Sequence, residues 1–378
     1  MLALAYFFIL LVFGMYAILM LYCRAGWQRT PTLHINKAYE PKTRVAIIIP
    51  ARNEAECLPR LLADLDAQIF PPHLWEIILI DDHSTDDTPT IAQAHRKVQL
   101  LSLANFITSN ETIAFKKKAI EIGIQHTQAE WIITLDADVR VGPWWLHSVV
   151  QTLETNKVKW LAGPVQFHAP KNWFEQFQQF DFLTMQGITA ALLTTHSGVM
   201  CNGANLAYSR RAYDTVQGFE GINHLASGDD MLLMQKIEQR FPHQSMYIKQ
   251  SDAIASTGYM PTLHAFIQQR IRWASKAKQF KDIKIQGVLL LVLLNNLLWF
   301  LLPLACLFQL MPWWFFLGLA TSHLFLEWLL LNDVFSFFQS RGNIIQFILL
   351  KMLHVPYILI SGFWGMFGSY TWKDRTVH

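Results

Sequence analysis

The stretch that decides the fold is Trp131-Ile132-Ile133-Thr134-Leu135-Asp136-Ala137-Asp138, an apolar run that ends in two carboxylates separated by one small residue. Side chains at positions i and i+2 of a strand point to the same side, so Asp136 and Asp138 aim at one point if the strand geometry persists. Two hard oxygen ligands at the carboxyl end of a parallel sheet suit Mg²⁺ or Mn²⁺. The alternative interpretation is a strand followed by an Asp-rich turn.

The pattern on the N-terminal side of this stretch predicts a parallel sheet. Continuous apolar runs at 44–50 and 75–80 indicate strands buried on both faces, and 98–101 indicates a third. Helices are expected after the first run and at 88–96 and 114–126, which gives an α/β fold with helices on both faces of the sheet. The chain lacks the Gly-x-Gly-x-x-Gly and Walker loops, so neither a dinucleotide-binding dehydrogenase nor a P-loop NTPase is supported.

Both ends of the 378-residue chain are apolar enough to cross a membrane. Residues 2–22 carry no charge, no basic segment precedes them and no small-x-small cleavage site follows, so we expect a retained transmembrane anchor over residues 1–23. The region 286–370 should contribute about three α-helical spans, near 288–310, 313–331 and 344–367. The residues that leave the span count open by one are Glu327, Lys351, His354 and Pro356.

Basic residues follow the N-terminal apolar region and precede the C-terminal one, so both groups adjoin the middle of the chain. They are Arg24, Arg29, Lys37, Lys42 and Arg44 after the first span, and Lys276, Lys278, Lys281 and Lys284 before the second. Because such residues favour the cytoplasmic side, we expect an integral membrane protein of the inner (plasma) membrane with a cytoplasmic domain over residues 44–285. A net charge of +3 gives no case for nucleic acid, and neither the four cysteines nor His168, His196, His224 and His264 show metal-ligand spacing.

Six motifs follow one another along this middle region. They are Ile-Ile-Ile-Pro-Ala-Arg-Asn-Glu (47–54), Ile-Leu-Ile-Asp-Asp-His-Ser-Thr-Asp-Asp-Thr (78–88), Thr-Leu-Asp-Ala-Asp (134–138), Cys201–Tyr208, Ser227–Leu233 with its Gly-Asp-Asp, and Gln-x-x-Arg-Trp (269–273). In this order and at these distances they resemble a membrane-bound family 2 glycosyltransferase of the GT-A fold. The resemblance extends to ceramide glucosyltransferases and to processive polysaccharide synthases, and it implies a nucleotide-diphospho-sugar transferase domain over 44–285.

The resemblance implies a binding site for a nucleotide sugar linked to uridine or guanosine. The residues it assigns to this site are Pro50, Asn53, Glu54, Asp81, Asp82, Lys116, Asp136, Gln269, Arg272 and Trp273. Asp81 and Asp82 can accept hydrogen bonds from a base and ribose, or belong to a capped turn. Lys116 lies where the family often carries a Lys-Ala-Leu-Asn element, but this chain has Glu121 where the family has Asn. The alternative for Lys116 is that it belongs to a solvated basic helix face. Arg272 would clamp the diphosphate, unless its helix is simply an amphipathic interfacial one.

The remaining roles concern the metal, the base and the acceptor. Asp138, with Asp136, would hold Mg²⁺ or Mn²⁺ beside the departing diphosphate. Asp230, supported by Asp229, would be the general base that takes the proton of an acceptor hydroxyl; the alternative is an acidic N-terminus for the helix 231–240. The expected acceptor-side residues are Cys201, Asn202, Gly203 and Asn205, whose amides can bind hydroxyls and whose glycine permits close approach.

Two segments, 172–195 and 262–284, are predicted to be interfacial helices beneath the bilayer. The first would place its aromatic face in the lipid boundary, or would instead be a buried core helix. Together these features predict an inverting, metal-dependent glycosyltransferase that moves a sugar to a lipid or lipid-linked acceptor at the cytoplasmic membrane face. A processive polysaccharide synthase that exports its glycan and an inactive nucleotide-sugar-binding membrane scaffold are the alternatives.

Overall fold

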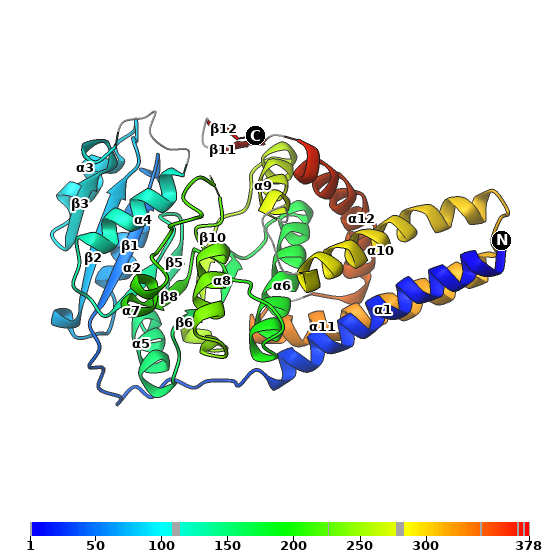
Figure 1. The fold of residues 1–378 in the computed structure, drawn as a ribbon, viewed down its shortest axis with the longest axis horizontal. Helices are drawn as coiled ribbons and strands as arrows, with labels where there is room; N and C mark the ends of the chain where they lie inside the picture. The colour runs from blue at the N-terminus through cyan, green and yellow to red at the C-terminus, as the bar shows by residue number, and fades with distance from the viewer. Residues whose placement is uncertain are drawn as a thin grey trace. The chain divides into compact units, whose positions relative to one another are not determined.

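The computed structural model describes residues 2–107, 114–225, 227–276, 283–340, 342–368, 370–372 and 375–377, so the prediction for Lys278 and Lys281 falls outside the described residues. The chain forms two compact units, and each combines segments that are distant in sequence (Figure 1). The sheet unit comprises residues 30–168 and 192–258, and the helical unit comprises Met1–Arg29, Ala169–Ala191 and Tyr259–His378. Segments predicted as interfacial helices therefore belong to the same unit as the apolar helices.

The sheet unit is built on a seven-stranded sheet with the order β3-β2-β1-β4-β8-β6-β9. Its strands are β1 (Val45–Ala51), β2 (Trp75–Asp81), β3 (Val98–Ser102), β4 (Trp131–Thr134), β6 (Trp160–Ala162), β8 (Leu206–Ser209) and β9 (Ser245–Tyr247). The first four in this order are parallel, β8 is antiparallel to both β4 and β6, and β9 is parallel to β6. The predicted α/β class with a mainly parallel sheet is confirmed.

Six helices and a small second sheet complete what the structure describes of this unit. The helices are α2 (Leu58–Asp66), α3 (Thr88–Ala94), α4 (Phe115–Gln125), α5 (Trp145–Thr155), α7 (Arg210–Thr215) and α8 (Met231–Arg240). The second sheet has the order β5 (Arg140–Val141), β10 (Ala255–Thr257) and β7 (Val165–Phe167). Short 3-10 turns lie at Pro72–Leu74, Leu103–Asn105 and Ser251–Ala253.

The strand order places a topological switch point between β1 and β4. The chain steps from β1 outward to β2 and β3, then returns across β1 to form β4. Right-handed crossovers therefore put α2 and α3 on one face of the sheet and α4 on the other. On α4, Gly123 allows a close approach, since a Cβ there would lie 2.8 Å from Ile80 Cδ1 and 2.9 Å from Ile48 Cγ2. Open α/β sheets bind ligands at the carboxyl ends of the strands beside such a switch point.

The helical unit contains the apolar helices at the two ends of the chain. Its elements are α1 (Leu2–Arg29), most of α6 (Trp173–Thr194), α9 (Leu263–Ser275), α10 (Ile283–Leu307), α11 (Trp313–Phe337), α12 (Ile344–Phe367) and the hairpin of β11 (Tyr370–Trp372) and β12 (Arg375–Val377). Within the described residues, four helices are long and apolar enough to cross a membrane, at Ala3–Arg29, Ile285–Leu307, Trp313–Phe337 and Ile344–Met366. Large apolar side chains on them are exposed, as at Phe7 (65%) and Ile345 (68%), which suits a lipid environment.

Two charged residues inside these apolar helices, Glu327 and Lys351, are paired with each other. Lys351 Nζ on α12 lies 2.7 Å from Glu327 Oε1 on α11, and the Tyr16 hydroxyl of α1 donates to the same oxygen at 2.7 Å. Buried charges that neutralise each other in this way are tolerated within membrane helices. Glu327 and Lys351 are therefore compatible with spans at both predicted positions.

The aromatic face of α6 packs on protein, which differs from the prediction that it lies in the lipid boundary. Phe177 and Phe180 are buried, with ring centroids 5.6 Å from Phe266 of α9 and 4.6 Å from Phe335 of α11, respectively. The stretch 172–195 was predicted from composition, which does not reveal whether lipid or other helices cover an aromatic face. Over this stretch α6 matches the alternative of a buried core helix.

Candidate active site

Two loops at the carboxyl ends of β1 and β2 are held together by hydrogen bonds. The Asn53 N–H donates to Ser84 Oγ (3.0 Å), and Asn53 Oδ1 accepts from the Thr85 N–H (2.8 Å). The Glu54 N–H donates to Thr88 Oγ1 at 2.7 Å. Asn53 has a φ of 53°, in the left-handed region that asparagine tolerates better than most residues. This Asn53 side chain therefore organises the loop pair as part of the predicted nucleotide site.

Asp81 and Asp82 are buried at the carboxyl end of β2. Asp81 Oδ1 accepts from the Ser84 N–H at 3.3 Å, and the Asp82 N–H donates to the Ala51 carbonyl at 2.8 Å. Asp82 Oδ1 lies 3.0 Å from His83 Nδ1, and an Arg52 guanidinium nitrogen lies 4.0 Å from the same oxygen. The end of β2 thus carries two oriented carboxylates beside Pro50, which lies in β1 opposite Ile80.

Lys116 joins two of the acidic motifs. Its Nζ on α4 lies 2.7 Å from Asp136 Oδ1, after β4, and 3.2 Å from Asp229 Oδ2, before α8. Burial alone would lower the pKa of the Lys116 ammonium, but the carboxylates of Asp136 and Asp229, with Asp230 behind them, outweigh burial and raise that pKa. Lys116 is therefore a permanent cation between carboxylates that would otherwise repel each other.

The acceptor-side loop reaches the same place through its glycine. A Cβ added to Gly203 would lie 3.3 Å from Asp229 Oδ2, 3.4 Å from Lys116 Nζ and 3.7 Å from Asp230 Cβ. The Thr134 hydroxyl at the end of β4 donates to the Gly203 carbonyl at 3.1 Å and fixes this approach. The structure therefore brings together Lys116 and residues of three predicted motifs: Asp136, Gly203 and the Asp229-Asp230 pair.

Three lysines in a row on α4 have three different environments. Lys116 meets the carboxylates, whereas Lys118 pairs with Glu121 at 3.0 Å on the helix surface. Lys117 is buried and donates to three backbone carbonyls of the segment before the Gly-Asp-Asp motif, at 2.7, 2.7 and 2.8 Å: those of Ile222, Leu225 and Ser227. Sequence reasoning missed Lys117 because its partners are carbonyls about 100 residues away.

Asp230 also begins α8. Its Oδ1 accepts from the Met231 N–H at 2.7 Å, and the preceding Gly228 has a φ of +83°, which favours glycine. The capping role proposed as the alternative is thus present, and it fixes the carboxylate next to Asp229. Capping and proton transfer are compatible, because an ionised carboxylate has about four acceptor sites.

Asn205 differs from its predicted acceptor role. It is 2% exposed, its Nδ2 donates to the carbonyls of Pro164 and Ala253 at 2.9 Å each, and its Oδ1 accepts from Trp145 Nε1 at 3.2 Å. These bonds engage both ends of the amide, so Asn205 holds the scaffold beneath the loop. Asn202 Oδ1 accepts from the Ala204 N–H at 3.0 Å and shapes the turn, while Cys201 is half-buried.

The oxygens after β4 fit a hard divalent ion by their chemistry. Asp136 is one-third exposed, and Asp138 Oδ2 accepts from the Thr257 hydroxyl at 3.2 Å. Mg²⁺ is usually held by one or two carboxylates together with phosphate oxygens and water, and this pair offers such a set. Cys57 lies near these carboxylates. Burial and the negative charges of Glu54 and Asp138 raise the pKa of its thiol, which disfavours the reactive thiolate form.

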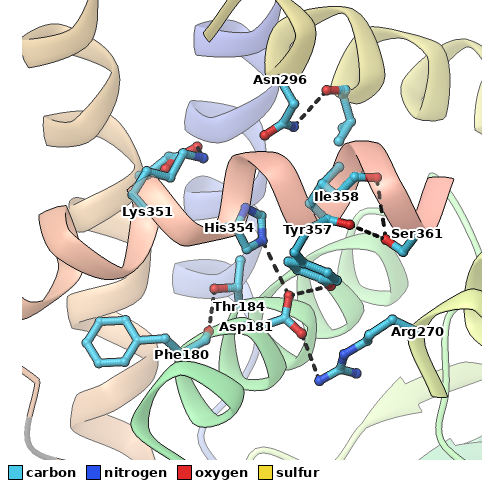
Figure 2. Close-up of polar contacts among 12 residues, drawn as sticks. Phe180, Asp181, Thr184, Arg270, Asn296, Lys351, His354, Tyr357, Ile358 and Ser361 are labelled. Atoms are coloured by element: carbon cyan, nitrogen blue, oxygen red, sulfur yellow. Dashed lines mark hydrogen bonds and ion pairs between the residues drawn. The ribbon is translucent and has the colours of Figure 1, made fainter. Parts of the chain in front are cut away.

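The Gln-x-x-Arg-Trp motif lies on α9, in the helical unit. There Arg270, which sequence reasoning passed over, is buried with Nη2 2.8 Å from Asp181 Oδ2 of α6 (Figure 2). Asp181 Oδ1 also accepts from the Tyr357 hydroxyl at 2.9 Å and lies 3.3 Å from His354 Nε2, both on α12. The guanidinium carbon of Arg270 lies 4.0 Å from the ring centroid of Trp273.

This buried ion pair fixes α9 within the helical unit. Arg270 can be buried because its guanidinium stacks on the Trp273 ring and pairs with the Asp181 carboxylate of another helix. The nucleotide-sugar roles of Gln269, Arg272 and Trp273 stay predictions.

The chain is similar to known glycosyltransferases in sequence and in fold. Residues 46–217 match the model of glycosyl transferase family 2. Similar curated proteins include the glycosyltransferase AglE of Haloferax volcanii, 25% identical over 191 residues, which are 50% of this chain and 59% of that protein. The dodecaprenyl-phosphate galacturonate synthase of Rhizobium johnstonii is 30% identical over 120 residues, 32% of this chain and 35% of that protein. The 4,4'-diaponeurosporenoate glycosyltransferase of Staphylococcus haemolyticus is 29% identical over 214 residues, 53% and 54% of the two chains.

The chain thus spans between about a third and three fifths of the length of these relatives. Among solved structures, the mannosyltransferase PcManGT of Pyrobaculum calidifontis, in complex with GDP-Man and Mn²⁺, is similar over 96% of this chain and 98% of its own. The TM-score is 0.56 at 17% sequence identity, which establishes a shared fold.

Proposed function

We propose that residues 46–217, which match the model of glycosyl transferase family 2 and have a GT-A-like fold, are the catalytic domain of an enzyme that transfers a sugar from a nucleotide sugar to a lipid or lipid-linked acceptor. The observation that carries the proposal is the convergence of Asp136, Asp229, Asp230 and Gly203 around Lys116 at the carboxyl end of the sheet. A scaffold protein has no need of half-buried carboxylates from separate motifs gathered around one lysine, whereas such clusters of ionisable groups are typical of functional sites.

A lipid acceptor is supported by two independent observations. Four helices are long and apolar enough to cross a membrane, and related proteins carry names that specify dodecaprenyl phosphate and undecaprenyl phosphate. Basic residues near the C-terminal end of the first apolar helix, such as Arg24 and Arg29, favour the cytoplasmic side for the sheet unit that follows them in sequence. The reaction would then take place at the cytoplasmic face of the inner membrane.

The donor would bind across the ends of β1, β2 and β4. Asp81 and Asp82 offer acceptors to a base and ribose, and the loop organised by Asn53 is bonded to the loop that follows them. Asp138 and Asp136 would hold Mg²⁺ or Mn²⁺, which when bound supplies positive charge beside the diphosphate leaving group. Lys116 adds a fixed cation at the same place.

The chemical step requires one proton acceptor, and Asp230 is placed to be that group. It would take the proton of the acceptor hydroxyl as the hydroxyl oxygen attacks the anomeric carbon. The bond from that carbon to the diphosphate breaks on the opposite face, and its electron pair leaves with the nucleoside diphosphate. A single displacement inverts the anomeric configuration.

The test is transfer by the purified protein in lipid. A panel of labelled UDP- and GDP-sugars is incubated with a total lipid extract, and the label that moves into the organic phase is measured. We expect one donor to label one lipid class by a single sugar. A ladder of products would support the processive polysaccharide synthase instead, and failure with every donor, despite nucleotide-sugar binding, would support an inactive scaffold.

A further inference from the structure

A second group of potential metal ligands lies in the sheet unit, formed by residues without a role in the proposed reaction. His196 follows α6, Glu238 lies in the last turns of α8, and His243 follows α8. One ligand atom from each lies within 4.8 Å of the others, and the two imidazole centroids are 4.4 Å apart. Within the described part of the chain, no other three His, Cys, Asp or Glu side chains meet this distance.

The carboxylate of this group is held in place by its neighbours. Glu238 Oε2 accepts from Trp160 Nε1 at 3.1 Å, and Oε1 accepts from the His243 N–H at 2.9 Å. An ionised carboxylate retains acceptor capacity after two such bonds. Similar hydrogen bonds to the ligands of a metal orient them and are part of how metal sites are built.

Both histidines are presented to solvent from unusual backbone positions. His196 has a φ of 51° and His243 a φ of 61°, and both side chains are exposed. Few residue types other than glycine adopt this left-handed region readily, although histidine is among the enriched ones. Because both imidazoles are exposed, rotation about their χ angles can bring their nitrogens to a common ion.

We propose that His196, Glu238 and His243 bind a borderline transition-metal ion, with Zn²⁺ as the best-fitting species and water in the fourth position. Two imidazoles and one carboxylate form a donor set that zinc accepts. Ligand atoms about 2.0–2.1 Å from zinc in a tetrahedron lie roughly 3.3 Å apart. The exposed side chains therefore need to close by about 1.5 Å, which rotation about their χ angles supplies.

This site differs from the predicted magnesium or manganese site in chemistry. Asp136 and Asp138 offer only hard oxygen ligands, whereas two imidazoles select zinc, cobalt, nickel or copper over magnesium. The proposal therefore stands or falls independently of the glycosyl transfer.

Binding would tie two important segments together. His196 lies between α6 and the acceptor-side loop that contains Gly203, and Glu238 is on α8, which begins directly after Asp230. A metal ion held by both would restrain the acceptor-side loop relative to the helix that carries the proposed base. We expect bound zinc to raise the thermal unfolding temperature of the protein.

The experiment measures metal binding by the full-length protein in detergent, after chelator treatment and removal of any polyhistidine tag. Bound Co²⁺ should produce visible d–d absorption. Zn²⁺ should displace the Co²⁺, abolish this absorption and bind with a stoichiometry of one ion per chain. His196→Asn and His243→Asn should weaken Zn²⁺ binding at least tenfold, and asparagine tolerates the positive φ at both positions. His34→Asn, at an exposed histidine elsewhere in the sheet unit, is the matched control.

A further variant separates the two metal sites. Asp138→Asn should leave Co²⁺ absorption and Zn²⁺ stoichiometry unchanged, whatever it does to glycosyl transfer. The proposal is overturned if the wild-type protein binds no Zn²⁺ at micromolar concentration, if His243→Asn binds as the wild type does, or if Asp138→Asn abolishes binding.

Discussion

Lys116 Nζ lies 2.7 Å from Asp136 Oδ1, and this ion pair joins helix α4 to the end of β4 across 20 positions of sequence. The same ammonium lies 3.2 Å from Asp229 Oδ2, so one cation serves an acidic group from each of two motifs. The arrangement gives the carboxyl end of the sheet a fixed alternation of charge. In the proposed reaction, the diphosphate would meet Lys116 between Asp136, a proposed metal ligand, and Asp229, the proposed support of the base Asp230.

Replacement of Lys116 by methionine should reduce transfer strongly, because Asp136 and Asp229 then lose the cation between them. We expect kcat/KM to fall by roughly 10²–10³-fold, the magnitude seen when one electrostatic stabiliser is removed from an active site. Lys116→Arg, which keeps the charge, should retain part of the activity. If Lys116→Met had the kcat/KM of the wild type, Lys116 would have no role in the reaction.

Replacement of Lys117 should act through the loop it holds. Lys117→Met removes the buried donor of three backbone carbonyls, so the free energy of unfolding should fall by roughly 2–4 kcal/mol. We expect kcat to fall as well, because Gly228 and Asp230 follow the segment that carries these carbonyls. Lys118→Met is the matched control, since its surface ion pair with Glu121 contributes about 0–1 kcal/mol. Equal stability of the two variants, measured by thermal unfolding in detergent, would contradict this role.

Divalent ions should be required for transfer. Treatment with EDTA should abolish activity, and Mn²⁺ or Mg²⁺ should restore it, because Asp136 and Asp138 provide only part of a coordination sphere that phosphate oxygens complete. Asp138→Asn should raise the metal concentration needed for half-maximal activity. Full activity in excess chelator would refute the metal roles of both aspartates.

Breaking the ion pair of Asp181 and Arg270 should destabilise the helical unit. Asp181→Asn leaves a buried guanidinium without its counter-charge and should cost about 3–5 kcal/mol. The double variant Asp181→Asn, Arg270→Met should recover part of that loss, since neither charge is then left alone. Additive losses, measured by thermal unfolding, would show that the two side chains do not depend on each other.

Features that depend on neighbouring residues could be predicted from the sequence, whereas contacts between distant segments could not. The apolar runs of β1, β2 and β4 are local patterns, and the sheet that they predicted is confirmed. The acidic ends of these runs are equally local, and the roles of Asp136 and Asp138 stay predictions. The covering of the aromatic face of α6 was predicted wrongly, because the partner rings of Phe266 and Phe335 come from helices far along the chain.

The structural roles of side chains that bind backbone carbonyls were not predicted from the sequence. Lys117 and Asn205 both bind carbonyl groups, which every residue has, so no pattern of residue types marks their partners. The group of His196, Glu238 and His243 was hidden for a related reason: 42 positions separate the first two ligands, since 238 − 196 = 42, and no fixed spacing connects them.

The most direct test of the account compares Asp230→Asn with Asp214→Asn, an exposed aspartate of the same unit, for both donor binding and transfer. If Asp230 is the base, its variant should bind the nucleotide sugar with wild-type affinity and lose roughly 10²–10⁴-fold in kcat, whereas Asp214→Asn should match the wild type in both. Wild-type turnover by Asp230→Asn would contradict the proposed mechanism.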